Sequence, residues 1–169
     1  MCVRARTCAS VHSYVRECTS VCLSACLSAT RLYVCLTATT TPRVSFHATG
    51  LTDTHPAAGA PLLLPRVVHN HGHGYNATTG SFLAPINGTY WFMASTETYL
   101  KDTNAQLSLM VDDLNVHFMD TYEDTASQAG SVHAVVRLWA GQRVWLRCAG
   151  DSHFWGTPTA FSGFLIYPD

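Results

Sequence analysis

The segment Phe161-Ser162-Gly163-Phe164-Leu165-Ile166-Tyr167, close to the end of the sequence, decides the fold class. Successive side chains of an extended strand point to opposite faces, so Phe161 and Leu165 share one face while Phe164 lies on the other. A strand that is apolar on both faces is central in its sheet or covered by a neighbouring surface. The segment therefore predicts a strand in the interior of a β-sheet.

The same two-residue period continues upstream through residues 44–169. Apolar residues of one parity recur in short runs, and clusters of Gly, Asn, Asp and Thr separate the runs. We find no long helical stripe. Eight or more short strands with Gly-rich turns predict an all-β, antiparallel sandwich or jelly roll. The clearest runs are Val44/Phe46/Ala48, Leu107/Leu109/Val111, Val132/Ala134/Val136/Leu138 and Val144/Leu146/Cys148.

Residues 1–43 differ in composition from residues 44–169. They carry five Arg against one acid, a net charge of +4, whereas the rest carries −5. Six of the seven Cys lie before residue 36, and Cys begins a four-residue repeat over 18–29. Three interpretations stay open: a weak secretory signal, a disulfide tether between chains, or a disordered or artefactual extension. Simple repeats rarely specify a packed core, which favours the third.

Composition excludes several classes of protein. The 169 residues are 47% hydrophobic and 12% charged, with a formal net charge of −1. Ample apolar content with little charge argues against a disordered chain. Near-neutral charge argues against a nucleic-acid binder, which needs a basic face. No run of eighteen apolar residues exists, so we expect no transmembrane helix.

The sequence from about Val44 to Asp169 resembles the globular head domain of complement C1q, a member of the tumour-necrosis-factor-like jelly rolls. The resemblance implies about ten strands and assembly as a compact homotrimer. It also implies a secreted protein that binds other molecules without turning them over. The matching positions include Phe46, Tyr75, Asn76, Gly80, Phe82, Pro85, Gly88, Tyr90, Phe92, Gly141, Phe161, Gly163 and Phe164.

Several of these positions make physical sense in such a fold. Gly80 and Gly88 stand where turns want a positive φ or a close backbone approach. Tyr90 and Phe92 share one strand parity, so both rings face the core or a subunit interface. A trimer axis would supply the second cover that the last strand requires.

Three histidines, His69, His71 and His73, alternate along one stretch. On an extended strand all three would point to one face, a geometry that can ligate a transition metal. Jelly-roll metalloenzymes that begin with a similar His-x-His also need a nearby carboxylate. The residues from Gly74 to Thr78 contain none, so solvated loop histidines are the favoured interpretation.

Calcium is the one cofactor that the resemblance suggests, and none is required. Some members of the resembled family hold Ca²⁺ near the trimer apex with acids in one loop, and Asp120 matches the first of those acids. The second position aligns with Ser127, although Glu123 or Asp124 could substitute. A solvated acidic loop is the alternative.

Two Asn-x-Thr sequons, at Asn76 and Asn87, are candidate N-glycosylation sites. Asn87 lies in a turn before a strand and is the better candidate, because Asn76 occupies a position that could serve the fold. Cys148 shares parity with Val144 and Leu146, which predicts a lone buried thiol. Pairing with an upstream Cys is the alternative.

The stretch from Asp151 to Pro158 contains candidate ligand-binding residues. His153, Phe154 and Trp155 could form an exposed aromatic loop that stacks on a sugar or grips a protein. No nucleophile elbow or phosphate-binding Gly motif occurs. With the resemblance, this argues against an enzyme.

The sequence thus favours a secreted, trimeric, non-enzymatic recognition module. Three equal weak sites on one rigid trimer would bind carbohydrate, microbial surfaces or protein ligands by avidity, as in innate immune pattern recognition. One alternative is a cytokine-like or adhesion ligand for a single receptor. A second is a metal-dependent jelly-roll enzyme centred on the histidines. The sequence leaves open the ligand, and whether the trimer is formed by identical chains.

Overall fold

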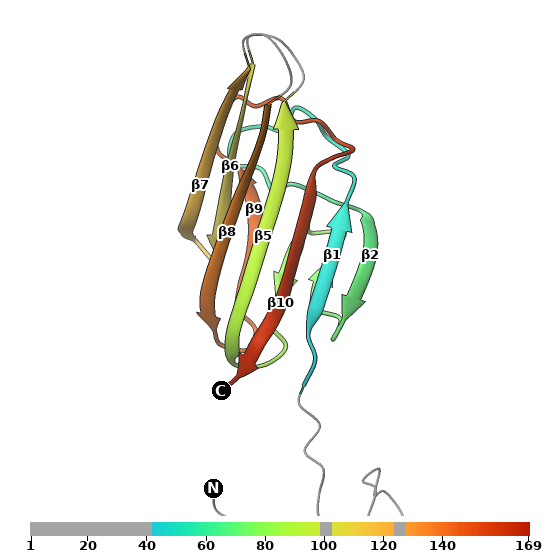
Figure 1. Ribbon diagram of the computed structural model, residues 1–169, viewed down its shortest axis with the longest axis vertical. Coiled ribbons are helices and arrows are strands. Elements are labelled where there is room, and N and C mark those ends of the chain that lie inside the picture. The colour runs from blue at the N-terminus through green and yellow to red at the C-terminus, as the bar shows by residue number, and fades with distance from the viewer. Residues whose placement is uncertain (1–41, 99–102, 124–127) are drawn as a thin grey trace, which may run out of the picture. The chain divides into compact units, whose positions relative to one another are not determined.

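A computed structural model describes residues 42–98, 103–123 and 128–169, which form two antiparallel five-stranded sheets facing each other (Figure 1). The predicted ten-stranded jelly roll is confirmed. The prediction that residues 1–43 form a separate segment concerns positions outside the described residues, apart from 42 and 43. Within the described residues no helix has the length and apolarity to cross a membrane.

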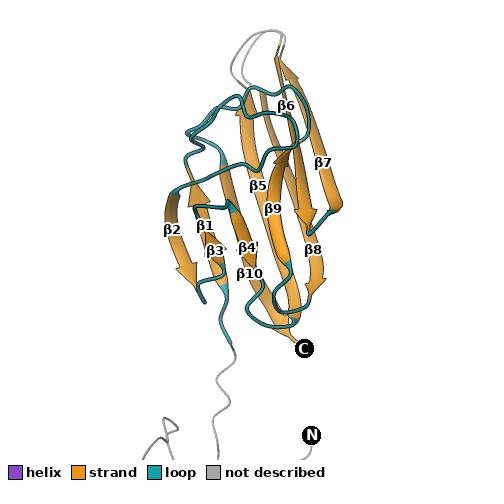
Figure 2. Ribbon diagram, turned by 180° about the vertical axis from the view of Figure 1, so that it is seen from behind, coloured by secondary structure: helices purple, strands orange, loops and turns teal. Residues whose placement is uncertain are grey.

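We call the two sheets the front sheet and the back sheet. In order across the sheet, the front sheet contains β2 (Arg66–His71), β1 (Ser45–Thr49), β10 (Ala160–Pro168), β5 (Gly88–Thr98) and β8 (Gln128–Leu138). The back sheet contains β3 (Tyr75–Asn76), β4 (Ser81–Leu83), β9 (Arg143–Cys148), β6 (Thr103–Val111) and β7 (Leu114–Glu123). Figure 2 shows the back sheet and the long connections that gather at one end of the sandwich.

Strand β10 is central in the front sheet, as its two apolar faces predict. It pairs with β1 on one side and β5 on the other, so that Gly163 lies opposite both Phe46 and Phe92. A side chain at Gly163 would overlap the rings of these two residues. The absence of a side chain at this position therefore lets two core rings pack against the middle of the sheet.

The core between the sheets is built around Phe46. The centroid of its ring lies 4.9 Å from that of Tyr75, 5.1 Å from Phe82 and 4.9 Å from Phe161. The side chains of Tyr90 and Phe92 are fully buried in the same cluster. These two rings thus belong to the core of the protomer rather than to an interface.

The turn glycines have the roles that the sequence predicts. Gly80 has a φ of +63°, and a side chain there would collide with the carbonyl oxygen of Leu62. A Cβ at Gly88 would lie 2.7 Å from the carbonyl oxygen of Tyr167. Gly141 also has a positive φ, of 89°, but a Cβ there would meet nothing within 4 Å.

The connection from β1 to β2 pairs with β9 beyond Ser81, the first residue of β4, and so continues the back sheet. The amide of Leu62 donates to the carbonyl of Leu146 (2.9 Å), and the amide of Cys148 donates to the carbonyl of Ala60 (2.9 Å). Leu62 is completely buried as a result. The connection is therefore anchored to β9, and its neighbouring residues are held in place at the end of the sandwich.

Tyr75 makes folding sensitive to alkaline pH. Burial raises the pKa of Tyr75 to about 12, and its hydroxyl donates a hydrogen bond to the carbonyl of Leu64 (3.2 Å). The unfolded chain loses this proton near pH 10, so the folded state loses stability as the pH rises from about 10 to 12. The loss is on the order of 2–3 kcal/mol.

We expect Tyr75→Phe to cost about 1 kcal/mol at pH 7, through the lost hydrogen bond, and to reduce the loss at alkaline pH. Urea unfolding of both proteins at pH 8 and pH 11 measures the effect. An equal loss of stability in both proteins between these pH values would show that Tyr75 is not the responsible group.

Candidate functional site

The loop from Ala149 to Thr159 joins β9 to β10 and carries the predicted aromatic residues. Trp155 is exposed to 42% of its surface, His153 is half-buried, and Phe154 is fully buried in the core. The expectation that Phe154 contributes to an exposed surface is wrong. Neighbouring residues in this extended stretch point in opposite directions, so the burial of Phe154 turns Trp155 outward.

Hydrogen bonds hold the backbone of Trp155 on both sides. Its amide donates to the carbonyl of Glu97 on β5 (2.6 Å), and its carbonyl accepts from the hydroxyl of Thr159 (2.6 Å). The Thr159 hydroxyl also lies 2.8 Å from the buried hydroxyl of Thr96, and the amide of Phe154 donates to the carbonyl of Thr54 (2.9 Å). The indole is therefore presented from a fixed backbone.

A shallow hollow of about 420 Å³ lies beside Trp155. Its lining includes a tryptophan, an arginine and three threonines. The amide of Leu51 donates to the carbonyl of Gly156 (3.0 Å), which ties two of the lining segments together. The hollow is lined by Thr49, Gly50, Leu51, Thr54, Arg66, Trp155, Gly156 and Thr157.

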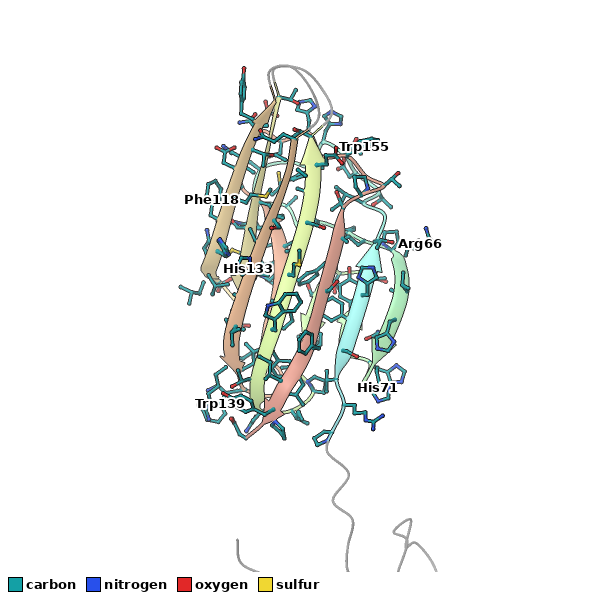
Figure 3. The ribbon with its side chains drawn as sticks, in the orientation of Figure 1. Arg66, His71, Phe118, His133, Trp139 and Trp155 are labelled. Atoms are coloured by element: carbon teal, nitrogen blue, oxygen red, sulfur yellow. The ribbon has the colours of Figure 1, made fainter. Side chains whose placement is uncertain are left out.

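Sequence reasoning missed Arg66 as a site residue. Arg66 begins β2, where it pairs in register with Thr49 of β1. Figure 3 shows Trp155 toward one end of the sandwich, Arg66 farther down along the side edge where β2 begins, and Trp139 at the opposite end. About 90 residues separate Arg66 from Trp155 in the sequence. The β1–β2 pairing places Arg66 beside Thr49, and the bond from Leu51 to Gly156 holds the Trp155 loop next to the same region. Residues 44–169 contain four Arg. This scarcity of arginine was the one feature of the sequence that could have drawn attention to Arg66.

The predicted histidine cluster is only partly assembled. The rings of His69 and His71 lie on β2 with centroids 6.3 Å apart and nearly parallel planes. His73 lies beyond the end of β2 with a φ of 53°, so the alternative in which all three share one strand face does not hold. Nε2 of His69 lies 2.7 Å from the hydroxyl of Ser45. Across residues 42–98, 103–123 and 128–169, no three His, Cys, Asp or Glu form a group that could hold a metal ion.

The candidate calcium ligands are described only in part. Asp120 lies exposed on β7, and its carboxylate accepts a hydrogen bond from the Gln106 side chain (3.0 Å). Glu123 ends β7, but its side chain is outside the described part, as is Asp124. Calcium binding therefore stays a prediction. A further acid, Asp112 in the turn between β6 and β7, has a structural role: its carboxylate accepts from the amide of Arg143 (2.9 Å) and from the Gln142 side chain (2.8 Å).

Both predicted glycosylation sites are exposed. The side-chain oxygen of Asn87 accepts from the amide of Ala140 (2.8 Å), and that of Asn76 accepts from the amide of Thr78 (2.9 Å). Both bonds are accepted by the side-chain oxygen. The side-chain nitrogen, which is the atom that carries a glycan, takes no part in them. Glycosylation itself stays a prediction. Cys148 is a free, buried thiol, as predicted.

The outer surface of the front sheet carries an apolar band. Val135, Trp91 and Phe164 lie opposite one another on β8, β5 and β10, and the ring centroids of Trp91 and Phe164 are 5.3 Å apart. Val135 is 61% exposed, Phe164 45% and Met93 37%. We call these four residues the front-sheet band.

The outer surface of the back sheet is different in character. Its largest side chain, Trp145, is only 9% exposed, because the guanidinium of Arg143 lies 4.5 Å from its ring and Met110 pairs with it from β6. The indole nitrogen donates to the carbonyl of Asp112 (2.8 Å). The back sheet therefore covers its tryptophan, whereas Val135 and Phe164 of the front-sheet band stay exposed.

Comparison with known proteins relates the chain to one family. Residues 45–166 match the family model described as the C1q domain. Complement C1q and tumor necrosis factor-related protein 9 of Mus musculus is 30% identical over 119 residues, which cover 66% of this chain and 35% of that protein. Complement C1q tumor necrosis factor-related protein 5 of Rattus norvegicus is 32% identical over 124 residues, which cover 68% of this chain and 49% of that protein. The match thus spans about half or less of the length of these relatives.

Two solved structures share the fold at low sequence identity. The globular domain of zebrafish complement 1qA protein matches with a TM-score of 0.62 and 19% identity, over 76% of this chain and 99% of that one. Murine APRIL matches with a TM-score of 0.59 and 11% identity, over 73% of this chain and 99% of that one. At such identities the likeness concerns the jelly roll alone.

Proposed function

Because the chain belongs to the C1q domain family, we propose that it is a secreted, non-enzymatic recognition module that assembles as a homotrimer. Its ligands are carbohydrate, microbial-surface or protein molecules, bound by avidity. The front-sheet band is the observation that carries the proposal, because an apolar surface laid across the middle of a sheet favours a protein partner.

A second copy of the chain is the partner that best fits the band. Phe164 lies at one end of the band, on β10, the central strand of the front sheet. Apolar residues on both faces of that strand favour a cover on its outer face. The edge formed by β7 and β8 carries further exposed rings, Phe118 and Tyr122. In a ring of identical protomers each copy can place one surface against a different surface of its neighbour, and rotation by a third of a turn closes the ring.

Trimer assembly gives the Trp155 hollow its function. A three-fold axis relates identical sites, so three hollows lie at equivalent positions on one rigid body. A ligand that binds each hollow weakly is then held strongly when it repeats on a surface, because the second and third contacts form at high effective concentration. A repeating glycan or a microbial surface meets this requirement.

The alternative of a ligand for a single receptor shares the fold and the trimer. It predicts tight binding to one protein and none to repeating glycans. The metal-dependent enzyme has no favouring observation among the described residues, because His73 is separated from the His69 and His71 strand face.

The test compares binding of the trimer and of a monomeric variant, Phe164→Glu, to arrayed glycans and to fixed bacterial cells. At the same total amount of protein, we expect the affinity of the trimer for a dense surface to exceed that of the monomer by about 10²-fold or more. The two proteins should bind a sparse surface equally. Equal binding at both densities would exclude avidity, and binding to neither surface would favour the single-receptor alternative.

A further inference from the structure

We propose that the hollow between Arg66 and Trp155 is a binding site for a carboxylated saccharide, a sugar ring that carries a carboxylate group. The proposal rests on the proposed recognition function and names the ligand class of its site. Three features of the hollow carry it: an aromatic wall, a guanidinium and a set of hydroxyl groups.

The aromatic wall is suited to the apolar face of a sugar ring. Trp155 is 42% exposed even though the adjacent Phe154 is fully buried, and two hydrogen bonds hold the backbone of Trp155 to β5 and to Thr159. A tryptophan that stays this exposed on a fixed backbone gives up burial worth about 25 cal/mol per Å². Its flat ring offers contact area at low cost in conformational entropy.

The guanidinium supplies a positive charge for the ligand. Arg66 is exposed, and no carboxylate of the described residues lies within ion-pair distance of it. By contrast, Arg137 at the opposite end of the sandwich pairs with Asp169 at 2.9 Å. The planar fork of an arginine matches a carboxylate with two parallel hydrogen bonds, which selects a carboxylate over a neutral group.

The remaining lining suits hydroxyl groups of a sugar. Three threonines, Thr49, Thr54 and Thr157, line the hollow, and no acid lines it. The volume of about 420 Å³ falls within the range of small-molecule sites, roughly 300–1,000 Å³. Because residues 44–169 carry a net charge of −5, attraction of an anion has to come from Arg66 locally. Binding should therefore weaken as salt rises.

Binding is measured with the full chain under reducing conditions, and the probes differ in charge and source. Sialyllactose represents a carboxylated glycan of animal type and an oligogalacturonate represents an acidic polysaccharide. Lactose is the neutral probe and a heparin-derived oligosaccharide the sulfated one. We expect binding of one or both carboxylated probes, which identifies the source, and at least tenfold weaker binding of lactose and of the sulfated probe.

Arg66→Gln and Trp155→Ala should each weaken binding of the carboxylated probe at least tenfold, while circular dichroism and molar mass stay unchanged. The matched controls are Arg143→Gln, an exposed arginine on the back sheet, and Trp139→Ala, a tryptophan exposed to 54% at the far end. Both controls should bind as the wild type does.

Unchanged binding in Arg66→Gln, equal binding of lactose, or preference for the sulfated probe would overturn this inference. The inference would also be overturned if a folded trimer bound none of the probes. If that trimer still bound bacterial cells avidly, the proposed function would stand. If the chain is monomeric in solution, the proposed function is contradicted. Binding of a carboxylated probe by that monomer would still support the saccharide site.

Discussion

Replacing Phe164 by Glu should convert the assembled protein into a folded monomer. Phe164 is the member of the front-sheet band on the central strand β10, and it lies between Trp91 on β5 and Ser45 on β1. Assembly through this surface would remove the new carboxylate from water without a partner, which costs several kcal/mol per protomer. Since Phe164 is 45% exposed in the single protomer, the fold of each copy should survive. We expect at least a thousandfold weaker association, measured by light scattering over a range of protein concentrations.

The matched control is Leu83→Glu. Leu83 is exposed to a similar degree, 49%, but it lies on β4 of the back sheet. The Leu83 variant should keep the molar mass of the wild type. If both variants stay assembled, the front-sheet band is not the surface that joins the protomers. If both dissociate, the effect is one of added charge and not of position.

Phe46→Ala should be the most destabilising single substitution in the core, by about 3–5 kcal/mol. Three ring centroids, those of Tyr75, Phe82 and Phe161, lie within 5.1 Å of the Phe46 centroid. Phe46 also packs beside Gly163, where no side chain is present to fill the gap. Removal of the ring therefore leaves a cavity that the neighbouring rings cannot close by small shifts. Denaturant unfolding at one fixed protein concentration measures the loss, because assembly adds to apparent stability.

Two controls separate this effect from a general loss of apolar surface. Phe46→Leu should cost much less than Phe46→Ala, because it keeps most of the buried volume. Leu114→Ala, at a side chain that is 66% exposed in the β6–β7 hairpin, should change stability by less than about 1 kcal/mol. A cost of Phe46→Ala below about 1.5 kcal/mol would show that the core is not organised around this ring.

The strands were predictable from the sequence because a half-buried strand leaves a period of two in its residues. The central position of β10 followed from apolar residues on both of its faces, and the burial of Cys148 followed from its parity with Val144 and Leu146. Gly163 shows the limit of this reasoning. Its position in the resembled family pattern is visible in the sequence, but its contact with the rings of Phe46 and Phe92 appears only in the folded sheets.

The site was less predictable because loops have no fixed period. His153, Phe154 and Trp155 look alike as a sequence cluster, yet the fold buries the middle residue and exposes the last. His73 falls outside the strand that holds its two neighbours because β2 ends at His71. Arg66 could not be linked to Trp155 from the sequence, since the pairing of β1 with β2 and the bond between Leu51 and Gly156 bring the two residues to one hollow.

The molar mass of the full chain in solution, under reducing conditions, tests the trimer most directly. It is measured first with calcium and then with a chelator, at several protein concentrations. We predict a mass of three chains in both conditions, which would make calcium dispensable for assembly. A trimer that dissociates in chelator would assign Asp120 and its neighbours to a calcium site. A single-chain mass in every condition would contradict trimer assembly and, with it, recognition by avidity.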